Sequence, residues 1–399
     1  MKKNRKIIIL LSAIIVIVSV VLLIVFKNKR EDFTGKVKGH LMASYSDLGI
    51  TNLNDDDLLQ FCDAATGEKI VLCDKPNCKH DNNDCNALFK DYAVHLSAIY
   101  NDRLYIVMEE EDRNFVLYEA DVNGSNRKKF VTLGKLQGSF DYLFLDNYLI
   151  IQYSKTYDME NIDSVAMELL EEPISGVAII NLKEQEVDYI PEKTDYEGGI
   201  QRIHMYEDKV YYSYLYMDIE YDFLDFENID FDYVANHTFY RIYSYDISSG
   251  TESTLYEGQN IYVEEINEEY AIIREYMNEK NVRIYAFNLL NQEEELIIEG
   301  RIYGNCIIDG DKLVYLSYSS EDVEAEEELS HFFYYYDLIS KESFYIGVAK
   351  KDVIASTELF LGDYAYILYD DEIGDCRPGC IPKEDFYKGD FDKVIKLLN

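Results

Sequence analysis

The sequence has no tryptophan, and it has only five proline and six histidine residues among 399. Without tryptophan the chain cannot carry the Trp-Asp signature of one large repeat family. It also contains no H-E-x-x-H, G-x-S-x-G, G-x-G-x-x-G or Walker-type loop, and no Asp-x-Asp-x-Asp-Gly calcium loop. Helical periodicity is scarce beyond residue 30. These absences exclude the common catalytic signatures and most helical folds.

Basic residues are scarce over most of the chain. Residues 1–30 contain seven of the 38 Lys and Arg residues and none of the 76 acids. The rest therefore has 31 basic against 76 acidic residues, a net charge of −45. Such a body repels nucleic acids and anionic lipid headgroups, so no nucleic-acid partner is expected.

One long hydrophobic run is present, at residues 7–26, where only Ser12 and Ser19 are polar. Twenty helical residues span about 30 Å, the thickness of the bilayer hydrocarbon core. Residues 27–30 follow with three cations and no small-x-small cleavage site, and no lipid-accepting cysteine is nearby. We therefore expect an uncleaved, single-pass signal-anchor in a bacterial cell membrane, with the N-terminus inside and the body outside.

This anchor divides the chain into three expected parts. Residues 1–30 form a cytoplasmic stub and transmembrane helix, residues 31–39 a tether, and residues 40–399 one large extracytoplasmic domain.

Two short signals recur in that domain. The first is a turn of Asp, Asn, Glu or Gly between two apolar runs, as expected for a β-hairpin. It occurs at residues 101–102, 146–147, 207–208, 267–269, 309–311 and 362–363, with a weaker copy at 46–49. The second is an alternating run that ends in Asp or Asn, at positions 63, 121, 181, 246, 288, 337 and 390.

Each interval between the strand-ending residues holds one hairpin signal, which makes a unit of four strands. Units of this size are typical of the blades of a β-propeller. The sequence therefore predicts an all-β, seven-bladed β-propeller of four-stranded antiparallel blades, with six blades as the alternative. A two-domain β-sandwich is the structural rival, although its units would not repeat so evenly.

Three acidic insertions fall between the second and third strands of their units, at residues 154–173, 217–236 and 319–330. In a propeller these loops lie on one face, and loops on a rigid scaffold commonly carry binding sites.

Four soft metal donors stand close together: Cys73, Cys78, His80 and Cys85 lie within thirteen positions as C-x4-C-x-H-x4-C. Three thiolates and one imidazole suit a four-coordinate zinc site, so zinc is the candidate cofactor.

Disulfides are the alternative, because an exported body meets an oxidising compartment. Cys376 and Cys380 are the possible partners, since the propeller arrangement would place both loops on the same face. Unpaired thiols are the third possibility. Cys62 and Cys306 stand in strand-like runs and are expected to be buried apolar residues.

The stretch LCDKPNCKHDNNDCNA, with the strand-like residues 58–63 before it and Tyr-rich repeats after it, resembles a group of Firmicute surface proteins. These proteins have an N-terminal anchor and a TolB-like β-propeller, and most are of unknown function. The resemblance covers most of residues 40–399 and is specific only at the Cys/His motif. It implies the fold and the location, and no activity.

These observations favour a membrane-anchored binding or scaffold module for a protein, peptide or cell-envelope ligand. The rival is an extracellular hydrolase or lyase that acts on glycan or peptide through an acidic central pocket. Strongly perturbed carboxylates converging in one pocket would favour the enzyme. No catalytic residue is assigned. A sensor is a third possibility, weakened by the short cytoplasmic stub.

Overall fold

A computed structural model describes the chain from residue 35 to residue 398. Its gaps are at 41–42, 91, 111–113, 136–140, 156–173, 192, 194–197, 219–232, 234–235, 278–280, 318–329, 351–353 and 371–374. The expected anchor and most of each acidic insertion lie outside the described residues. Within the described part, no helix has the length and apolar character needed to cross a bilayer.

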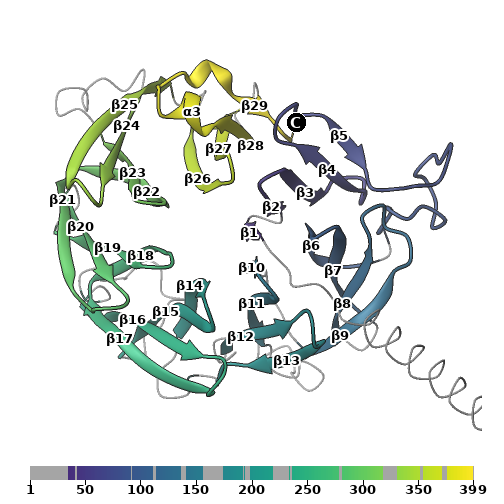
Figure 1. Ribbon diagram of the computed structural model, residues 1–399, viewed down its shortest axis with the longest axis horizontal. Helices are drawn as coiled ribbons and strands as arrows, with labels where there is room; N and C mark the ends of the chain where they lie inside the picture. Colours follow the sequence, from purple (N-terminus) through teal and green to yellow (C-terminus); the bar gives the residue numbers. More distant parts are fainter. Residues whose placement is uncertain are drawn as a thin grey trace, which may run out of the picture.

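The chain forms a ring of antiparallel β-sheets, as expected for a β-propeller (Figure 1). Five sheets are separate four-stranded blades. The first two are β6 (Val94–Tyr100), β7 (Arg103–Glu109), β8 (Asn114–Asp121) and β9 (Lys128–Lys135); and β14 (Gly198–Tyr206), β15 (Lys209–Met217), β16 (Thr238–Asp246) and β17 (Thr251–Gln259). The third and fourth are β18 (Ile261–Ile266), β19 (Tyr270–Tyr276), β20 (Val282–Asn288) and β21 (Glu294–Gly300); and β22 (Ile302–Asp309), β23 (Lys312–Ser317), β24 (Ser330–Asp337) and β25 (Glu342–Lys350). The last is β26 (Ser356–Leu361), β27 (Tyr364–Asp370), β28 (Cys376–Pro382) and β29 (Ile395–Lys396), with helices α3 (Lys383–Phe386) and η4 (Phe391–Lys393).

The remaining strands form one nine-stranded sheet with β1 (Lys36–His40) at its middle. One half is β2 (Ala43–Tyr45), β3 (Gly49–Leu53), β4 (Leu59–Asp63) and β5 (Lys69–Val71). The other half is β10 (Tyr142–Leu145), β11 (Tyr148–Lys155), β12 (Ile174–Asn181) and β13 (Glu186–Tyr189). Figure 1 places β1 toward the centre of the ring, where it joins the innermost strands of these two halves. The β6–β9 blade lies outward of this junction, on the side away from the ring centre.

The predicted number of separate blades, seven or alternatively six, is therefore wrong, because five are separate. The physical reason is β1, which pairs antiparallel with β2 on one side and with β10 on the other, so that two groups of four strands become one sheet. This strand also begins inside the stretch expected to be a tether. Lys36 lies opposite Leu145, and Lys38 lies opposite both Leu143 and Tyr45.

The hairpin turns lie where the sequence placed them. Asn101, Asp102, Asp146 and Glu207 all have positive φ angles at the turns between the first two strands of their units. Asn and Asp tolerate this left-handed conformation better than most residues, which explains why they recur there.

The strand-ending Asp and Asn residues stabilise the next turn. Asp63 Oδ1 accepts hydrogen bonds from the backbone amides of Ala65 and Thr66 at 3.0 and 2.8 Å. The side-chain oxygens of Asn288 and Asp337 likewise accept hydrogen bonds from the backbone amides two and three residues ahead. These bonds satisfy amides that the turn would otherwise leave open. The exception is position 390, because the third strand of the last unit ends at Pro382 and Asp390 precedes η4.

Apolar side chains join the first and last units of the ring. Tyr45 packs edge-to-face on Tyr366 at 5.2 Å between ring centroids. The Tyr366 hydroxyl donates to the Ser46 carbonyl at 2.7 Å, and the buried Cys62 thiol donates to the Leu397 carbonyl at 2.9 Å. The two ends of the chain thus close the ring around one apolar cluster.

Candidate functional site

The Cys/His loop follows β5 and fills the junction between the β2–β5 half-sheet and the β6–β9 blade. The amide of Leu59 donates to the Ala87 carbonyl at 2.8 Å, and the amide of Phe89 donates to the Asp57 carbonyl at 2.9 Å. Phe89 is buried, and the Arg127 guanidinium lies 4.3 Å from the centre of its ring. The loop is therefore fixed both to the β2–β5 half-sheet and to the β6–β9 blade.

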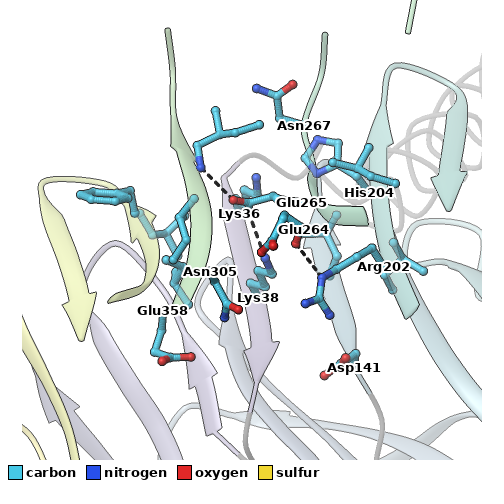
Figure 2. A pocket seen from close by; sticks show the side chains of 18 of the residues that line it. Lys36, Lys38, Asp141, Arg202, His204, Glu264, Glu265, Asn267, Asn305 and Glu358 are labelled. Carbon is cyan, nitrogen blue, oxygen red and sulfur yellow. Dashed lines mark hydrogen bonds and ion pairs between the residues drawn. The ribbon is translucent and has the colours of Figure 1, made fainter. Parts of the chain in front are cut away.

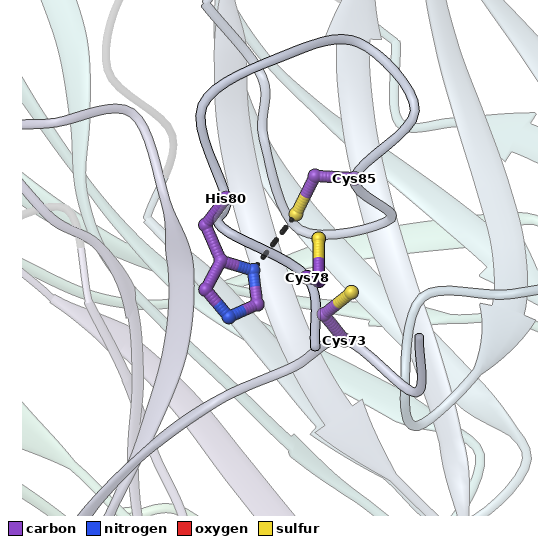
Figure 3. A group of neighbouring side chains, drawn as sticks. All are labelled: Cys73, Cys78, His80 and Cys85. Atoms are coloured by element: carbon purple, nitrogen blue, oxygen red, sulfur yellow. Dashed lines mark hydrogen bonds between the residues drawn. The ribbon is translucent and has the colours of Figure 1, made fainter. Parts of the chain in front are cut away.

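The four donors predicted from the sequence come together in this loop (Figure 3). The ligand atoms of Cys73, Cys78, His80 and Cys85 all lie within 4.8 Å of one another. His80 Nδ1 lies 3.1 Å from Cys85 Sγ. Positive φ angles at Asn77 and His80 turn the chain sharply enough to bring the four side chains to one point.

The chemistry of this donor set fits a metal ion. Burial raises the pKa of Cys85 to about 11. Burial acts in the same direction on Cys73, but hydrogen bonds from the backbone amides of Lys75 and Asn86, together with those from the Cys85 and Cys78 side chains, lower the pKa of that thiol. A bound cation would favour the thiolate form of all three cysteines. Three sulfurs and one nitrogen would supply the four ligands of a structural metal site.

The structure does not bring the proposed disulfide partners to this cluster. All seven cysteines of the chain are free thiols. Cys376 is exposed and donates to Asp370 Oδ1 at 3.1 Å, whereas Cys380 is buried in the ring-closing cluster and donates to the Ala64 carbonyl at 3.2 Å. Cys62 and Cys306 are fully buried, as predicted.

A second candidate site is a cavity of about 280 Å³ at the centre of the ring. Its walls are β1 and the innermost strands of the surrounding sheets, among them β14, β18, β22 and β26 (Figure 2). Sequence reasoning located an acidic central pocket only in general terms and missed the two cations of β1. The alternation of Lys36-Val37-Lys38 was the available signal, since Val37 is buried and both lysines line the cavity.

The most buried carboxylate of this cavity, Glu264, is already paired. The Arg274 guanidinium contacts Oε1, and the backbone amide of Cys306 donates to Oε2 at 3.2 Å. Burial raises the pKa of Glu264, and the positive charge of Arg274 acts in the opposite direction. A buried pair of this kind is expensive to break.

Two further carboxylates are engaged in the same way. Glu265 accepts a hydrogen bond from the Ile308 amide at 2.8 Å and lies 3.4 Å from Lys38 Nζ. Asp309 lies 2.6 Å from the Lys383 ammonium and accepts a hydrogen bond from the Tyr387 hydroxyl at 2.8 Å.

His204 is a buried histidine in the cavity wall, and its Nε2 lies 3.7 Å from Glu268 Oε1. Burial lowers the pKa of His204 to about 4, and the nearby Glu268 carboxylate opposes this only in part. Interaction with His204 lowers the pKa of Glu268 to about 2. At neutral pH the site therefore holds a neutral imidazole beside a charged carboxylate.

Comparison with known proteins supports the fold. No family model matches the chain, and no curated protein matches it. Among solved structures, a puromycin-hydrolysing peptidase from Mycobacterium tuberculosis has a TM-score of 0.51 and 9% identity, with 90% of this chain and 53% of the peptidase covered. The chain thus spans about half the length of that enzyme.

Two other solved structures are more distant in shape. An oligogalacturonate lyase in complex with manganese has a TM-score of 0.49 and 12% identity, covering 90% of this chain and 84% of the lyase. TolB from Acinetobacter baumannii has a TM-score of 0.32 and 10% identity, covering 80% of this chain and 65% of TolB. These two are too distant to carry a conclusion about this chain, and at 9% identity the likeness to the peptidase concerns the fold alone.

We expect the Cys/His loop to hold one metal ion per chain, measurable by elemental mass spectrometry of the full-length protein. Removing the metal with a chelator should lower the melting temperature, because a ligand present at 100 times its Kd stabilises the folded state by about 2.7 kcal/mol. His80→Ala should abolish the chelator effect, whereas His237→Ala, far from the thiols in sequence, should retain it. A loss of stability with reductant alone, and none with chelator, would contradict the metal assignment.

We also expect an acid-sensitive stability that depends on His204. Because its folded-state pKa of about 4 lies below the ordinary value of 6.5, the unfolded chain binds the extra proton first. Stability should therefore fall as the pH drops from 6.5 to 4, by at most about 3 kcal/mol from this residue. Urea titrations should show a flatter profile for His204→Gln over this range and an unchanged profile for His237→Gln. Equal slopes in all three proteins would exclude the assignment.

Proposed function

We propose that the protein is an extracytoplasmic binding or scaffold module for a protein, peptide or cell-envelope ligand. The observation that carries this proposal is the state of three of the carboxylates that line the cavity. Glu264, Glu265 and Asp309 each accept a hydrogen bond or ion pair from a cation, and the first two also from a backbone amide. A general acid or base must be free to exchange its proton with a substrate, and these groups are not.

The hydrolase or lyase alternative rests on an acidic central pocket. A pocket is present, but β1 introduces Lys36 and Lys38 into it, and Arg202 lines it as well. These cations reduce the negative potential that would attract a basic substrate or raise the pKa of a catalytic carboxyl. A pocket whose negative charge is partly offset from within supports binding better than acid–base chemistry.

Zinc is our proposal for the metal of the Cys/His loop. A closed shell of three thiolates and one imidazole, with no open position for water, supports a structural role for the ion. In this role zinc would hold the junction beside β5 and would take no part in a reaction.

We further propose that residues 7–26 anchor the protein in a bacterial cell membrane, as in the Firmicute proteins that the sequence resembles. The Tyr100 hydroxyl lies within hydrogen-bond distance of the carbonyls of Gly35 and Asp146, at 3.0 and 2.8 Å, and can donate its single proton to either. Asp146 belongs to the hairpin turn between β10 and β11. The chain thus enters the ring at the face that carries these turns, which supports placing that face nearest the membrane.

Protease added to intact cells should remove the domain that follows residue 35, since the proposed topology exposes it outside. A cytoplasmic marker protein should stay intact in the same sample. Full protection of the domain in intact cells, with cleavage only after lysis, would reverse the orientation.

Binding and catalysis differ in stoichiometry, which gives a direct test of the function. Full-length protein in nanodiscs would be incubated with a mixture of two- to six-residue peptides and of oligosaccharides from cell envelopes, followed by mass spectrometry. A binding module should retain at most about one equivalent per chain and release it with unchanged mass. Products that accumulate beyond the amount of protein, and not with heat-denatured protein, would establish an enzyme instead.

A further inference from the structure

We infer that the central cavity binds a short zwitterionic peptide, with its carboxylate on Lys36 and its free ammonium group at the Asp141 end. This inference rests on the proposed binding function and names the ligand class and its orientation. It follows from the arrangement of the charged groups that the cavity leaves without partners.

Lys36 supplies the first unsatisfied charge. The side chain is half-buried in the cavity wall, and no hydrogen bond or ion pair joins its ammonium group to any other part of the described chain. Burial lowers the pKa of Lys36, and the neighbouring charge of Lys38 acts in the same direction. Glu265 and Glu268 act at longer range, and each already faces another partner, Lys38 and His204. A ligand carboxylate would supply the counter-ion that the fold does not.

Asp141 supplies the opposite charge at the other end of the cavity. It directly precedes β10, and the structure gives its carboxylate no hydrogen bond or ion pair with a described residue. Glu358 from β26 also lines this part of the cavity, and the Ser356 hydroxyl contacts one of its oxygens. Figure 2 shows Asp141 and Glu358 on the side of the cavity away from Lys36, with the Asn305 amide between the two ends.

The strand register gives the length of the ligand. Lys36 lies opposite Leu145 and Gly39 lies opposite Tyr142, so Asp141 is four residues from the level of Lys36. At about 3.3 Å per residue the two levels are about 13 Å apart along the strand. An extended peptide of about three residues places its two charged ends at a matching separation once the side chains of Lys36 and Asp141 reach inward.

The volume and the charge of the cavity further restrict which class of ligand it can bind. A cavity of about 280 Å³ lies just below the usual range for ligand pockets, so the peptide must have small side chains. A polyamine would leave Lys36 without a counter-ion. A polyanionic glycan would meet Asp141, Glu358 and a chain of net charge −38. A zwitterion satisfies both ends, and the Asn305 amide can hydrogen-bond to its backbone.

Isothermal titration calorimetry of the full-length protein in nanodiscs would use trialanine as the probe. N-acetyl-trialanine removes the ammonium charge, and trialanine amide removes the carboxylate. Each capped peptide should bind at least tenfold more weakly than trialanine, since a charge-assisted hydrogen bond is lost in each case.

Two variants test which residue of the cavity binds each end of the peptide. Lys36→Met should lose the preference for a free carboxylate and keep the preference for a free amine, and Asp141→Asn should do the reverse. Lys128→Met is the matched control, because Lys128 pairs with Glu119 on the outer strands β8 and β9 and should leave both preferences unchanged. Melting curves of all three variants would verify that they fold.

Equal binding of trialanine and its capped forms, or preferences that survive both substitutions in folded protein, would overturn the inference. If oligosaccharides from that mixture are retained while no peptide is, trialanine included, the binding function stands and the peptide assignment fails. If neither is retained, both fail.

Discussion

The pairing of β1 with two other strands is the constraint on which the arrangement of the ring depends. A strand at the edge of a sheet carries unpaired amide and carbonyl groups, and β1 covers such an edge on β2 and on β10 together. It does so close to the axis of the ring, with Val37 buried behind it. Two groups of strands, at residues 43–71 and 142–189, are thereby held in a single sheet.

The same strand determines the character of the cavity. The body of the protein is strongly acidic, and its innermost strands bring Glu264, Glu265 and Glu358 toward the axis. Lys38 offsets part of this charge through Glu265, and the Lys36 ammonium makes no hydrogen bond or ion pair within the described chain, with Glu265 and Glu268 acting on it only at longer range. The cavity is thus polar at both ends, and its deepest carboxylate is held in an internal ion pair with Arg274.

At the outer edge of the ring, one half of the nine-stranded sheet ends in a very short strand. β5 contains only three residues, so the outer edge of its half-sheet is short. The following loop completes the junction through main-chain bonds from Leu59 and Phe89 and through the buried side chains of Phe89 and Cys85. A loop of this length has little core of its own, and a bound metal ion would supply the order that a longer strand gives elsewhere.

Local features of the fold were predictable from the sequence, and long-range ones were not. Asp63, Asn288 and Asp337 could be recognised because each bonds to amides two or three residues ahead. The Cys/His cluster was predictable for the same reason, since its four donors are close in the chain. The cavity was not, because its residues come from strands between β1 and β26. Lys36 and Lys38 read as a polar tether, since the pairing of β1 with β10 involves residues more than one hundred positions away, and only Lys38 has a nearby partner, Tyr45.

Hydrogen exchange of the β1 amides, followed by mass spectrometry on the full-length protein, tests this account most directly. If β1 is an integral part of the ring, its amides should exchange as slowly as those of β11, which lies deep in the same sheet. Fast exchange in β1 with full protection of β11 would contradict it, since the strand would then be a detachable segment and the two halves of the nine-stranded sheet would hold together without it.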